Sequence, residues 1–308
     1  MGRRRREIRG EAVDGILLLD KPAGITSNGA LQDARKLLHA RKAGHTGSLD
    51  PIATGLLPLC FGKTTRWSGY FLGSDKHYKT RIRLGESTDT GDCEGKIVSQ
   101  TKVTVTKKQL FSALDAFRGC YIQIPPMFSA IKVNGQPLYK LARQGKEIER
   151  EGREVVVKSL EVLSFDGQDV ELELVSTSGF YVRSLAHDLG QALSVGGHVV
   201  ALRRLGVAGL RVENAVTLEE LGTLADPAAR RHKLCAVDES LIHLPAVELS
   251  VDAAFYLCRG QAVRARNLPS EGNVRLYSSG AGFLGIGSVS GQDTVTPERL
   301  SGGEVKTG

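Results

Sequence analysis

One aspartate in a glycine-rich loop is the residue of this chain best suited to covalent chemistry. The loop has the sequence GHTGSLDP over residues 44–51, and Asp50 is its only acid. Its glycines allow positive φ angles and a close approach of the backbone to a partner, and the Asp-Pro step favours a turn. An isolated Asp-Pro pair is usually a plain surface turn. The complete eight-residue pattern, in which His45 lies five residues before the acid, is harder to obtain by turn chemistry alone.

A carboxylate that acts as a nucleophile must stay ionised, and a neighbouring arginine favours that state. The guanidinium group lowers the pKa of the acid and can bind both carboxylate oxygens. The segment GFYVR at residues 179–183 supplies a candidate in Arg183. Tyr181 lies two residues earlier, so both side chains point to the same side of an extended backbone. The alternative for a Tyr-x-Arg pattern is an ordinary amphipathic strand.

Two further residues are candidates for the walls of a binding pocket. Tyr78 lies among basic residues in the sequence DKHYK, a combination that can stack on a nucleobase and hold nearby phosphates. Leu202 precedes Arg203 and Arg204 and can supply an apolar wall. Taken alone, half-buried packing is the usual role of such a tyrosine, and core packing is that of such a leucine.

Hydrophobic periodicity predicts strands and helices that interleave along the chain. Strict alternation at residues 170–174 indicates a strand with one wet face, Ser27 is the expected N-cap of a helix, and capping boxes begin at Thr106 and Thr217. Because no regular βαβ repeat occurs, we predict an α+β domain built on a mixed, largely antiparallel sheet with flanking helices. The other expected strands span residues 15–19, 56–61, 79–84 and 199–207, and another helix covers 182–193.

The chain is expected to hold one large domain and one small one. Residues 1–11, which include four consecutive arginines, are predicted to form a disordered basic arm. Residues 12–243 form the predicted main domain, and the irregular basic segment 123–152 is an insertion in it. Short β-like runs broken by glycines predict a small β-rich domain at residues 246–302, and residues 301–308 are expected to fray.

Composition favours a cytoplasmic protein with an anionic partner. The 308 residues carry 41 lysines and arginines against 34 acids, a formal net charge of +7. The five cysteines are odd in number and widely spaced, which suggests a reducing compartment and neither a disulfide framework nor a metal site. The longest aliphatic run, residues 16–19, is too short to span a bilayer, and no signal peptide follows the arginine cluster, so we expect no membrane association.

Three common enzyme signatures are absent from the sequence. Six residues separate Gly55 from Gly62, which precedes Lys63 and Thr64, whereas a Walker phosphate loop needs about four. The sequence has neither a G-x-S-x-G nucleophile elbow nor an H-E-x-x-H zinc motif, and its seven histidines are scattered. We therefore expect neither a metal nor another cofactor.

Six motifs resemble, in order, those of the TruB-type tRNA pseudouridine synthases, and the resemblance covers nearly all of the chain. The Asp50 loop is the most specific of them, and Phe128 stands where the family more often has tyrosine. The motifs are Lys21-Pro22-x-Gly24, the Asp50 loop, Tyr78, Gln123-x-Pro125-Pro126-x-Phe128-Ser129-Ala130-x-Lys132, Gly179-x-Tyr181-x-Arg183 and Leu202-Arg203-Arg204.

The resemblance implies a role for each residue of the site. Asp50 would be the nucleophile and Arg183 its ion-pair partner. Tyr78 would stack on the target uracil, and Tyr181 and Leu202 would complete the pocket.

Further residues would act on the RNA around that pocket. His45 would fill the space vacated by the flipped nucleotide, and Lys21, Lys132 and Arg143 would bind RNA. The implied fold is the pseudouridine synthase fold followed by a PUA-like domain at residues 246–302.

The implied activity is the isomerisation of uridine-55 in the T loop of tRNA to pseudouridine, by base flipping and without a cofactor. The protein would bind the T arm as a monomer, and the insertion favours direct binding of tRNA over a guide RNA. Attack of Asp50 on the ribose C1′ and formation of a glycal both stay open. The group that removes the C5 proton is also open. Tyr78 is a candidate, although a phenol with a pKa of about 10 is a poor base.

Two other classes of protein remain as alternatives. A hydrolase of nucleosidic bonds can also use an aspartate at the anomeric carbon, and it would release free uracil from RNA. An RNA chaperone would carry out no chemistry and would tolerate the loss of Asp50.

Overall fold

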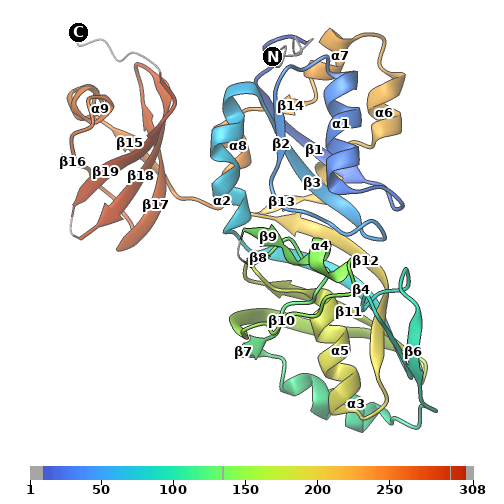
Figure 1. The fold of residues 1–308 in the computed structure, drawn as a ribbon. Coiled ribbons are helices and arrows are strands. Elements are labelled where there is room, and N and C mark those ends of the chain that lie inside the picture. Colours follow the sequence, from blue (N-terminus) through green and yellow to red (C-terminus); the bar gives the residue numbers. More distant parts are fainter. Residues whose placement is uncertain (1–9, 134, 292, 303–308) are drawn as a thin grey trace. The chain divides into compact units, whose positions relative to one another are not determined.

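The computed structural model of the chain describes residues 10–133, 135–291 and 293–302. The chain forms two compact units, which divide between Leu234 and Cys235 (Figure 1). Residues 1–9 of the predicted arm and residues 303–308 of the predicted tail lie outside the described part.

Glu11 differs from its predicted place in the basic arm. Its backbone N–H donates to the carbonyl oxygen of His39 at 2.7 Å, and its carboxylate pairs with Arg231 at 2.7 Å. Glu11 is therefore an ordered part of the first unit.

A mixed sheet is the framework of the first unit (Figure 1). Its strands are β1 (Gly15–Lys21), β2 (Ala43–His45), β3 (Thr54–Phe61), β4 (Lys76–Leu84), β7 (Gly119–Gln123), β10 (Arg153–Phe165), β11 (Asp169–Ser176), β12 (Gly197–Val207), β13 (Leu210–Arg211) and β14 (Leu234–Cys235). The order along the main path is β14-β1-β3-β12-β4-β11-β10-β7. Strands β3 and β12 pair in parallel, while the other pairs with a defined register are antiparallel, so the predicted sheet type is confirmed.

Alternation along β11 explains why this segment forms a strand with one wet face. Its apolar residues Val170, Leu172 and Leu174 are fully buried. Glu171 and Glu173 alternate with them and pair with basic side chains of β4 on the other face. Burial of each such apolar side chain contributes about 1.5–3 kcal/mol, whereas the exposed ion pairs contribute about 1 kcal/mol or less.

Helices flank this sheet, and most of those in the first unit are short. They are α1 (Ser27–Leu37), α2 (Ser68–Leu72), α3 (Lys107–Asp115), α4 (Leu138–Ala142), α5 (Val182–Ala192), α6 (Leu218–Thr223) and α7 (Pro227–Arg231), with the 3-10 turns η1 (Gly62–Trp67) and η2 (Val212–Asn214). The capping boxes predicted at Thr106 and Thr217 are present. The N-cap of α1 is Thr26 rather than Ser27, because the Ser27 hydroxyl bonds to the backbone of Leu49.

Helix α5 packs closely against β12 because a glycine lies at their contact. A methyl group at Gly190 would lie 2.2 Å from the carbonyl carbon of Gly196 and 2.3 Å from the nitrogen of Gly197. Val182, Leu185 and other apolar residues of α5 are buried beneath this contact. The C-terminal part of α5 is thereby held against the sheet.

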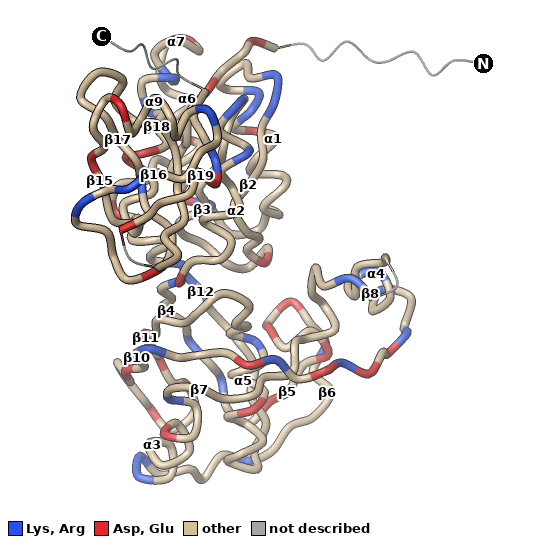
Figure 2. Tube along the Cα trace, turned by 90° about the vertical axis from the view of Figure 1, so that its left-hand side faces the viewer, with Lys and Arg blue, Asp and Glu red and all other residues tan. Residues whose placement is uncertain are grey.

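Two smaller hairpins project from the first unit. Strands β5 (Glu86–Thr88) and β6 (Ile97–Gln100) form one, and β8 (Lys132–Val133) and β9 (Gln136–Pro137) form the other, just before α4. The second hairpin and α4 lie in the insertion predicted from the sequence. Figure 2 shows lysines and arginines along this insertion, with acidic residues between them.

The second unit is rich in strands. Its five-stranded sheet has the order β15-β17-β18-β19-β16. The strands are β15 (Ala246–Leu249), β16 (Val263–Arg264), β17 (Glu271–Ser278), β18 (Gly282–Ser290) and β19 (Thr294–Leu300), and the helices are α8 (Val237–Ser240) and α9 (Val251–Cys258). Helix α9 contributes Ala254 and Leu257 to a separate apolar core.

Candidate active site

The loop that carries Asp50 is held by the junction of β1 and α1. The Ser27 hydroxyl accepts from the Leu49 N–H at 2.7 Å and donates to the Leu49 carbonyl at 3.0 Å. The N–H of Gly24 donates to the carbonyl of Pro51 at 2.9 Å. Both neighbours of Asp50 are therefore fixed by hydrogen bonds.

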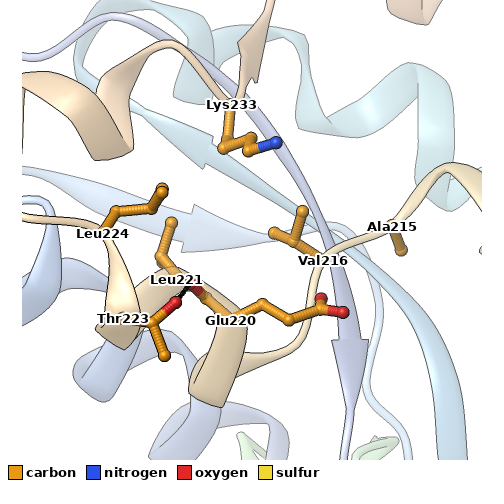
Figure 3. A pocket seen from close by; sticks show the side chains of 7 residues that line it. All are labelled: Ala215, Val216, Glu220, Leu221, Thr223, Leu224 and Lys233. Atoms are coloured by element: carbon orange, nitrogen blue, oxygen red, sulfur yellow. Dashed lines mark hydrogen bonds between the residues drawn. The ribbon is translucent and has the colours of Figure 1, made fainter.

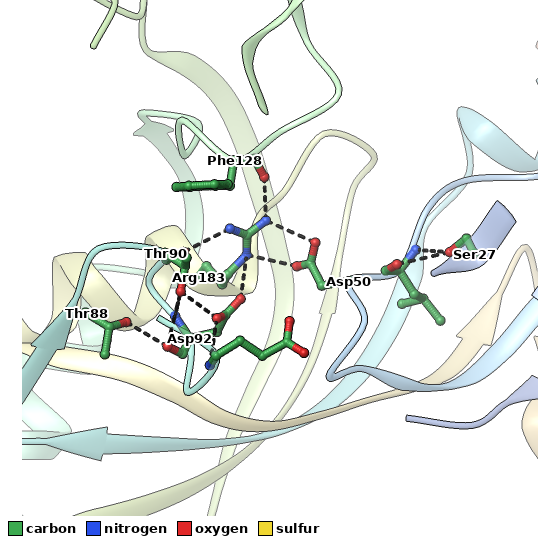
Figure 4. Close-up of polar contacts among 9 residues, drawn as sticks. Ser27, Asp50, Thr88, Thr90, Asp92, Phe128 and Arg183 are labelled. Carbon is green, nitrogen blue, oxygen red and sulfur yellow. Dashed lines mark hydrogen bonds and ion pairs between the residues drawn. The ribbon is translucent and has the colours of Figure 1, made fainter. Parts of the chain in front are cut away.

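Asp50 and Arg183 form a two-point ion pair (Figure 4). The Nε of Arg183 donates to Oδ2 of Asp50 at 2.8 Å, and Nη2 donates to Oδ1 at 3.1 Å. The guanidinium also donates to the carbonyl of Thr90 at 2.9 Å and to that of Phe128 at 2.7 Å. Because only 5% of the Arg183 side chain is exposed, these partners fix the cation and, through it, the carboxylate.

A second acid, Asp92, shares the same guanidinium and was missed by the sequence analysis. Its Oδ2 lies 3.8 Å from Nε of Arg183, and its Oδ1 accepts from the hydroxyl of Thr90 at 2.6 Å and from the N–H of Glu94 at 3.2 Å. Its side chain is nearly fully buried. The run of threonines and aspartates at residues 88–92 could have indicated a turn that is held by hydrogen bonds of its own side chains.

The surroundings shift the pKa of Asp50 upward. Burial is the main cause and favours the neutral acid, and the charge of Asp92 acts in the same direction. Arg183 opposes both effects and lowers the pKa. Arg183 lowers the pKa of Asp50, as expected of an arginine beside an acid. Burial has the larger effect, so the pKa of Asp50 is raised overall.

Tyr78 and Leu202 lie on one face of adjacent strands. Tyr78 of β4 is directly opposite Arg204 of β12, and Leu202 is opposite Thr80, so all four side chains share that face. The Arg204 guanidinium is buried and donates to the carbonyl of Leu56 at 2.8 Å and to the Tyr78 hydroxyl. Burial raises the pKa of Tyr78, while Arg204 lowers it.

Tyr181 stands at the N-terminus of α5, next to the ion pair. Its backbone N–H and carbonyl are both bonded to the side chain of Gln123. The spacing predicted that Tyr181 and Arg183 point to the same side of an extended segment. Tyr181 is the N-cap of a helix, however, and Arg183 lies in the first turn of that helix rather than in an extended strand.

His45 is the last residue of β2 and lies in the Asp50 loop. Its Nδ1 is buried and has no hydrogen-bond partner among the described residues. Burial, and after it the charge of Arg204, lowers the pKa of His45, which favours the neutral imidazole.

An RNA-binding lysine is expected to face outward, but Lys21 does not. Its side chain is fully buried, and its Nζ donates to the carbonyls of Pro22 at 2.7 Å, Ile25 at 2.8 Å and Pro51 at 3.3 Å. Burial lowers the pKa of Lys21 to about 8, although Asp50 opposes this. The ammonium group has no donor left for a phosphate, and it holds the Asp50 loop instead.

Lys132 and Arg143 lie in the insertion and are exposed. Lys132 is in β8, and Arg143 follows α4 with its guanidinium 5.6 Å from the ring centre of Tyr139. Neither contacts the ion pair in the described structure, so both cations stay available to a polyanion.

A hollow of about 350 Å³ beside α6 is separate from these residues (Figure 3). It is lined by a mixture of apolar and polar side chains and has none of the site residues in its walls. Within the described residues, no group of three or more histidines, cysteines and acids could hold a metal ion. No helix among them is long and apolar enough to cross a membrane.

Sequence comparison identifies the family of the chain. The model described as TruB family pseudouridylate synthase (N terminal domain) matches residues 35–182. The tRNA pseudouridine synthase B of Stutzerimonas stutzeri (strain A1501) is 48% identical over 291 residues, which cover 94% of this chain and 95% of that protein. This chain belongs to the TruB family. It is thus a pseudouridine synthase, an isomerase, as the six motifs predicted.

Other TruB relatives and solved structures agree with this assignment. The tRNA pseudouridine synthase B of Pseudomonas aeruginosa (strain UCBPP-PA14) is 47% identical over 292 residues, 94% of this chain and 96% of that protein. Two further models, described as tRNA pseudouridylate synthase B C-terminal domain and Pseudouridine synthase II TruB, C-terminal, match residues 183–242 and 245–301.

Chains of solved structures share the fold. A chain of a Cbf5-Nop10-Gar1 complex superposes with a TM-score of 0.73 at 25% identity, covering 94% of this chain and 85% of that chain. A chain of an H/ACA RNP bound to a substrate RNA shares the fold, with a TM-score of 0.69 at 23% identity over 93% of this chain and 84% of that chain. The predicted fold class is confirmed.

Proposed function

We propose that this TruB family enzyme converts uridine-55 in the T loop of tRNA to pseudouridine. The observation that carries the proposal is the two-point ion pair between Arg183 and Asp50 in a family of pseudouridylate synthases. A carboxylate held at both oxygens has a fixed direction, which a nucleophile at a sugar carbon needs. The names of its curated relatives support tRNA as the substrate.

The reaction moves the bond of the ribose from one ring atom of uracil to another. The target uridine leaves the stack and enters the site, at a cost of about a few kcal/mol. The bond between C1′ and N1 breaks, the base turns, and C1′ bonds to C5. The C5 proton leaves and N1 takes up a proton, so that the product is an isomer of the substrate. Asp50 takes part either by attacking C1′ or by assisting the formation of a glycal.

Side chains around Asp50 suit a flat, uncharged base. Tyr78 is half-buried on the face that it shares with Leu202, and its ring can stack on uracil, while Tyr181 completes the pocket from the start of α5. The Tyr78 phenol is a candidate for removal of the C5 proton, with Arg204 beside its oxygen. His45, whose pKa is lowered, is a neutral ring that can fill the place of the flipped nucleotide without a charge penalty.

Binding of the T arm requires cations that lie free on the surface. Exposed Lys132 and Arg143 in the insertion at residues 123–152 supply them, so we assign the grip on tRNA to this segment. We assign catalysis to residues 12–243 and a PUA-like domain to residues 246–302. The enzyme acts in the cytoplasm as a monomer, and it needs neither a guide RNA nor a cofactor.

Release of tritium from C5-labelled uridine tests this function. Purified protein alone should release tritium from a tRNA transcript, and a transcript with cytidine at position 55 should give none at that site. The Asp50→Asn variant should be inactive. Failure of the wild-type protein to release tritium would refute the proposal. Free uracil would identify a hydrolase, and a requirement for added RNA would identify a guided enzyme.

A further inference from the structure

The root of the insertion is bonded to the backbone at the start of α5. Gln123, the last residue of β7, is 1% exposed. Its Oε1 accepts from the N–H of Tyr181 at 2.8 Å, and its Nε2 donates to the carbonyl of Tyr181 at 3.1 Å. Its Nε2 also donates to the Tyr121 hydroxyl at 2.8 Å. The side-chain amide therefore pairs with the two polar groups of one residue, as a neighbouring strand would.

Two more hydrogen bonds join the same two segments. The hydroxyl of Ser184 donates to the carbonyl of Ile124 at 2.7 Å, and Nη2 of Arg183 donates to the carbonyl of Phe128 at 2.7 Å. Figure 4 shows Phe128 and Asp50 around the Arg183 guanidinium. The cation that holds the catalytic carboxylate is thus also bonded to the insertion.

The start of α5 depends on these contacts. The N-cap residue of the helix, Tyr181, provides no side-chain cap, and its first turn contains no acid. An uncapped helix start leaves N–H groups without partners inside the helix. Gln123 satisfies the N–H of Tyr181, so the orientation of the first turn, which includes Arg183, is set from the insertion.

The two ends of the insertion meet at this same point. Gln123 pairs with Arg153 across β7 and β10, and a methyl group on Gly152 would lie 2.4 Å from the side chain of Ile122. Both ends of the insertion are therefore fixed by close contacts. A bound ligand that displaces the insertion would also displace its root.

We propose that Gln123 is a positioning residue that couples the RNA-gripping insertion to the Arg183–Asp50 ion pair. When RNA engages Lys132 and Arg143, the root of the insertion sets the orientation of Arg183 and hence of the carboxylate. This inference rests on the proposed function, because it assumes that the insertion binds the substrate.

The Gln123→Met variant tests the coupling, because methionine keeps the length of the side chain and removes both hydrogen bonds to Tyr181. We expect the single-turnover rate at saturating enzyme to fall about tenfold to a hundredfold, since a misplaced group close to the reaction has this effect. The Kd for tRNA should stay within about twofold, because Gln123 is buried and its side chain is bonded to Tyr181 and Tyr121. The acid limb of the pH profile should move to higher pH, since a loosened Arg183 lowers the pKa of Asp50 less.

A matched control and a second cycle separate coupling from damage. Gln168→Met changes an exposed glutamine in the turn between β10 and β11, and it should leave the rate and the pH profile unchanged. The combined changes Lys132→Gln and Arg143→Gln should reduce the rate less in the Gln123→Met background than in wild type. Gln123→Met has already removed the connection between the insertion and Arg183. Additive losses would contradict the coupling.

Two further outcomes decide the inference. If Gln123→Met does not fold, as judged by circular dichroism, Ser184→Ala removes a single bond of the same set and should give a smaller change of the same kind. The coupling would be overturned if the wild-type enzyme is active and both Gln123→Met and Ser184→Ala keep its rate and pH profile. The proposed function would not be affected by that result. Inactive wild-type enzyme would overturn the proposed function.

Discussion

Replacement of Asp92 by asparagine should lower the pKa of Asp50. The acid raises that pKa through its charge, so its neutralisation moves the acid limb of the rate profile to lower pH. The two carboxylates contact Nε of Arg183 at 2.8 Å and 3.8 Å. Their oxygens therefore lie within about 6.6 Å, where two charges interact by about 0.6 kcal/mol in water and about 2.5 kcal/mol at an effective dielectric constant of about 20. Because 35% of the Asp50 side chain is exposed, water screens the pair. We expect a fall of about 0.5 to 1 pKa unit.

Single-turnover tritium release, followed across the acid limb of the pH profile, measures this shift. An asparagine oxygen can still accept from Thr90 and Glu94, so the turn should survive. Asp89→Asn is the control, because it removes the same charge from an exposed residue of the same loop whose carboxylate accepts from the backbone of Lys96. An acid limb that stays in place, or that moves to higher pH in Asp92→Asn, would refute the electrostatic reasoning.

Three further perturbations follow from the described contacts. Arg204 lowers the pKa of Tyr78, so Arg204→Met should raise it. The titration of Tyr78 is obtained by ultraviolet absorbance as the difference between each protein and its Tyr78→Phe counterpart, and equal titrations in wild type and Arg204→Met would contradict the role of Arg204. The combined Lys132→Gln and Arg143→Gln variant should weaken tRNA binding and reduce the slope of log K against log salt by about 1 to 2, whereas an unchanged slope would mean that the insertion contacts no phosphates. Gly190→Ala places a methyl group 2.2 Å from backbone atoms, so urea unfolding should show a loss of about 1–3 kcal/mol or more, and full stability would disprove the tight helix–sheet contact.

Local pattern was sufficient to predict much of the framework. Alternation predicted β11 with its buried and wet faces, and the two capping boxes placed the starts of α3 and α6. The identity of the N-cap of α1 was wrong, because Ser27 is used by a contact to Leu49, which lies 22 residues away. Rules of helix capping consider only neighbouring residues, so they cannot predict a contact between residues this far apart.

The candidate site was predictable only where a motif carried a known resemblance. Asp50 and Arg183 lie 133 residues apart, and periodicity alone would not have paired them. Asp92 and Gln123 went unassigned because their importance comes from what they touch: one shares a guanidinium, and the other pairs with a backbone. The resemblance implied that Lys21 binds RNA, whereas three carbonyl groups surround its ammonium group.

Two acids on one guanidinium have opposite effects at different stages of the proposed reaction. Asp92 makes Asp50 harder to ionise before catalysis. When Asp50 bonds to C1′ or takes up a proton, its charge disappears, and the nearly buried Arg183 would be left without a counter-ion. An unpaired buried charge costs about 3–5 kcal/mol, and Asp92, at 3.8 Å, offsets that cost. The Asp92→Asn variant should therefore show a lower plateau rate together with an acid limb at lower pH, a combination that simple misfolding of the loop would not produce.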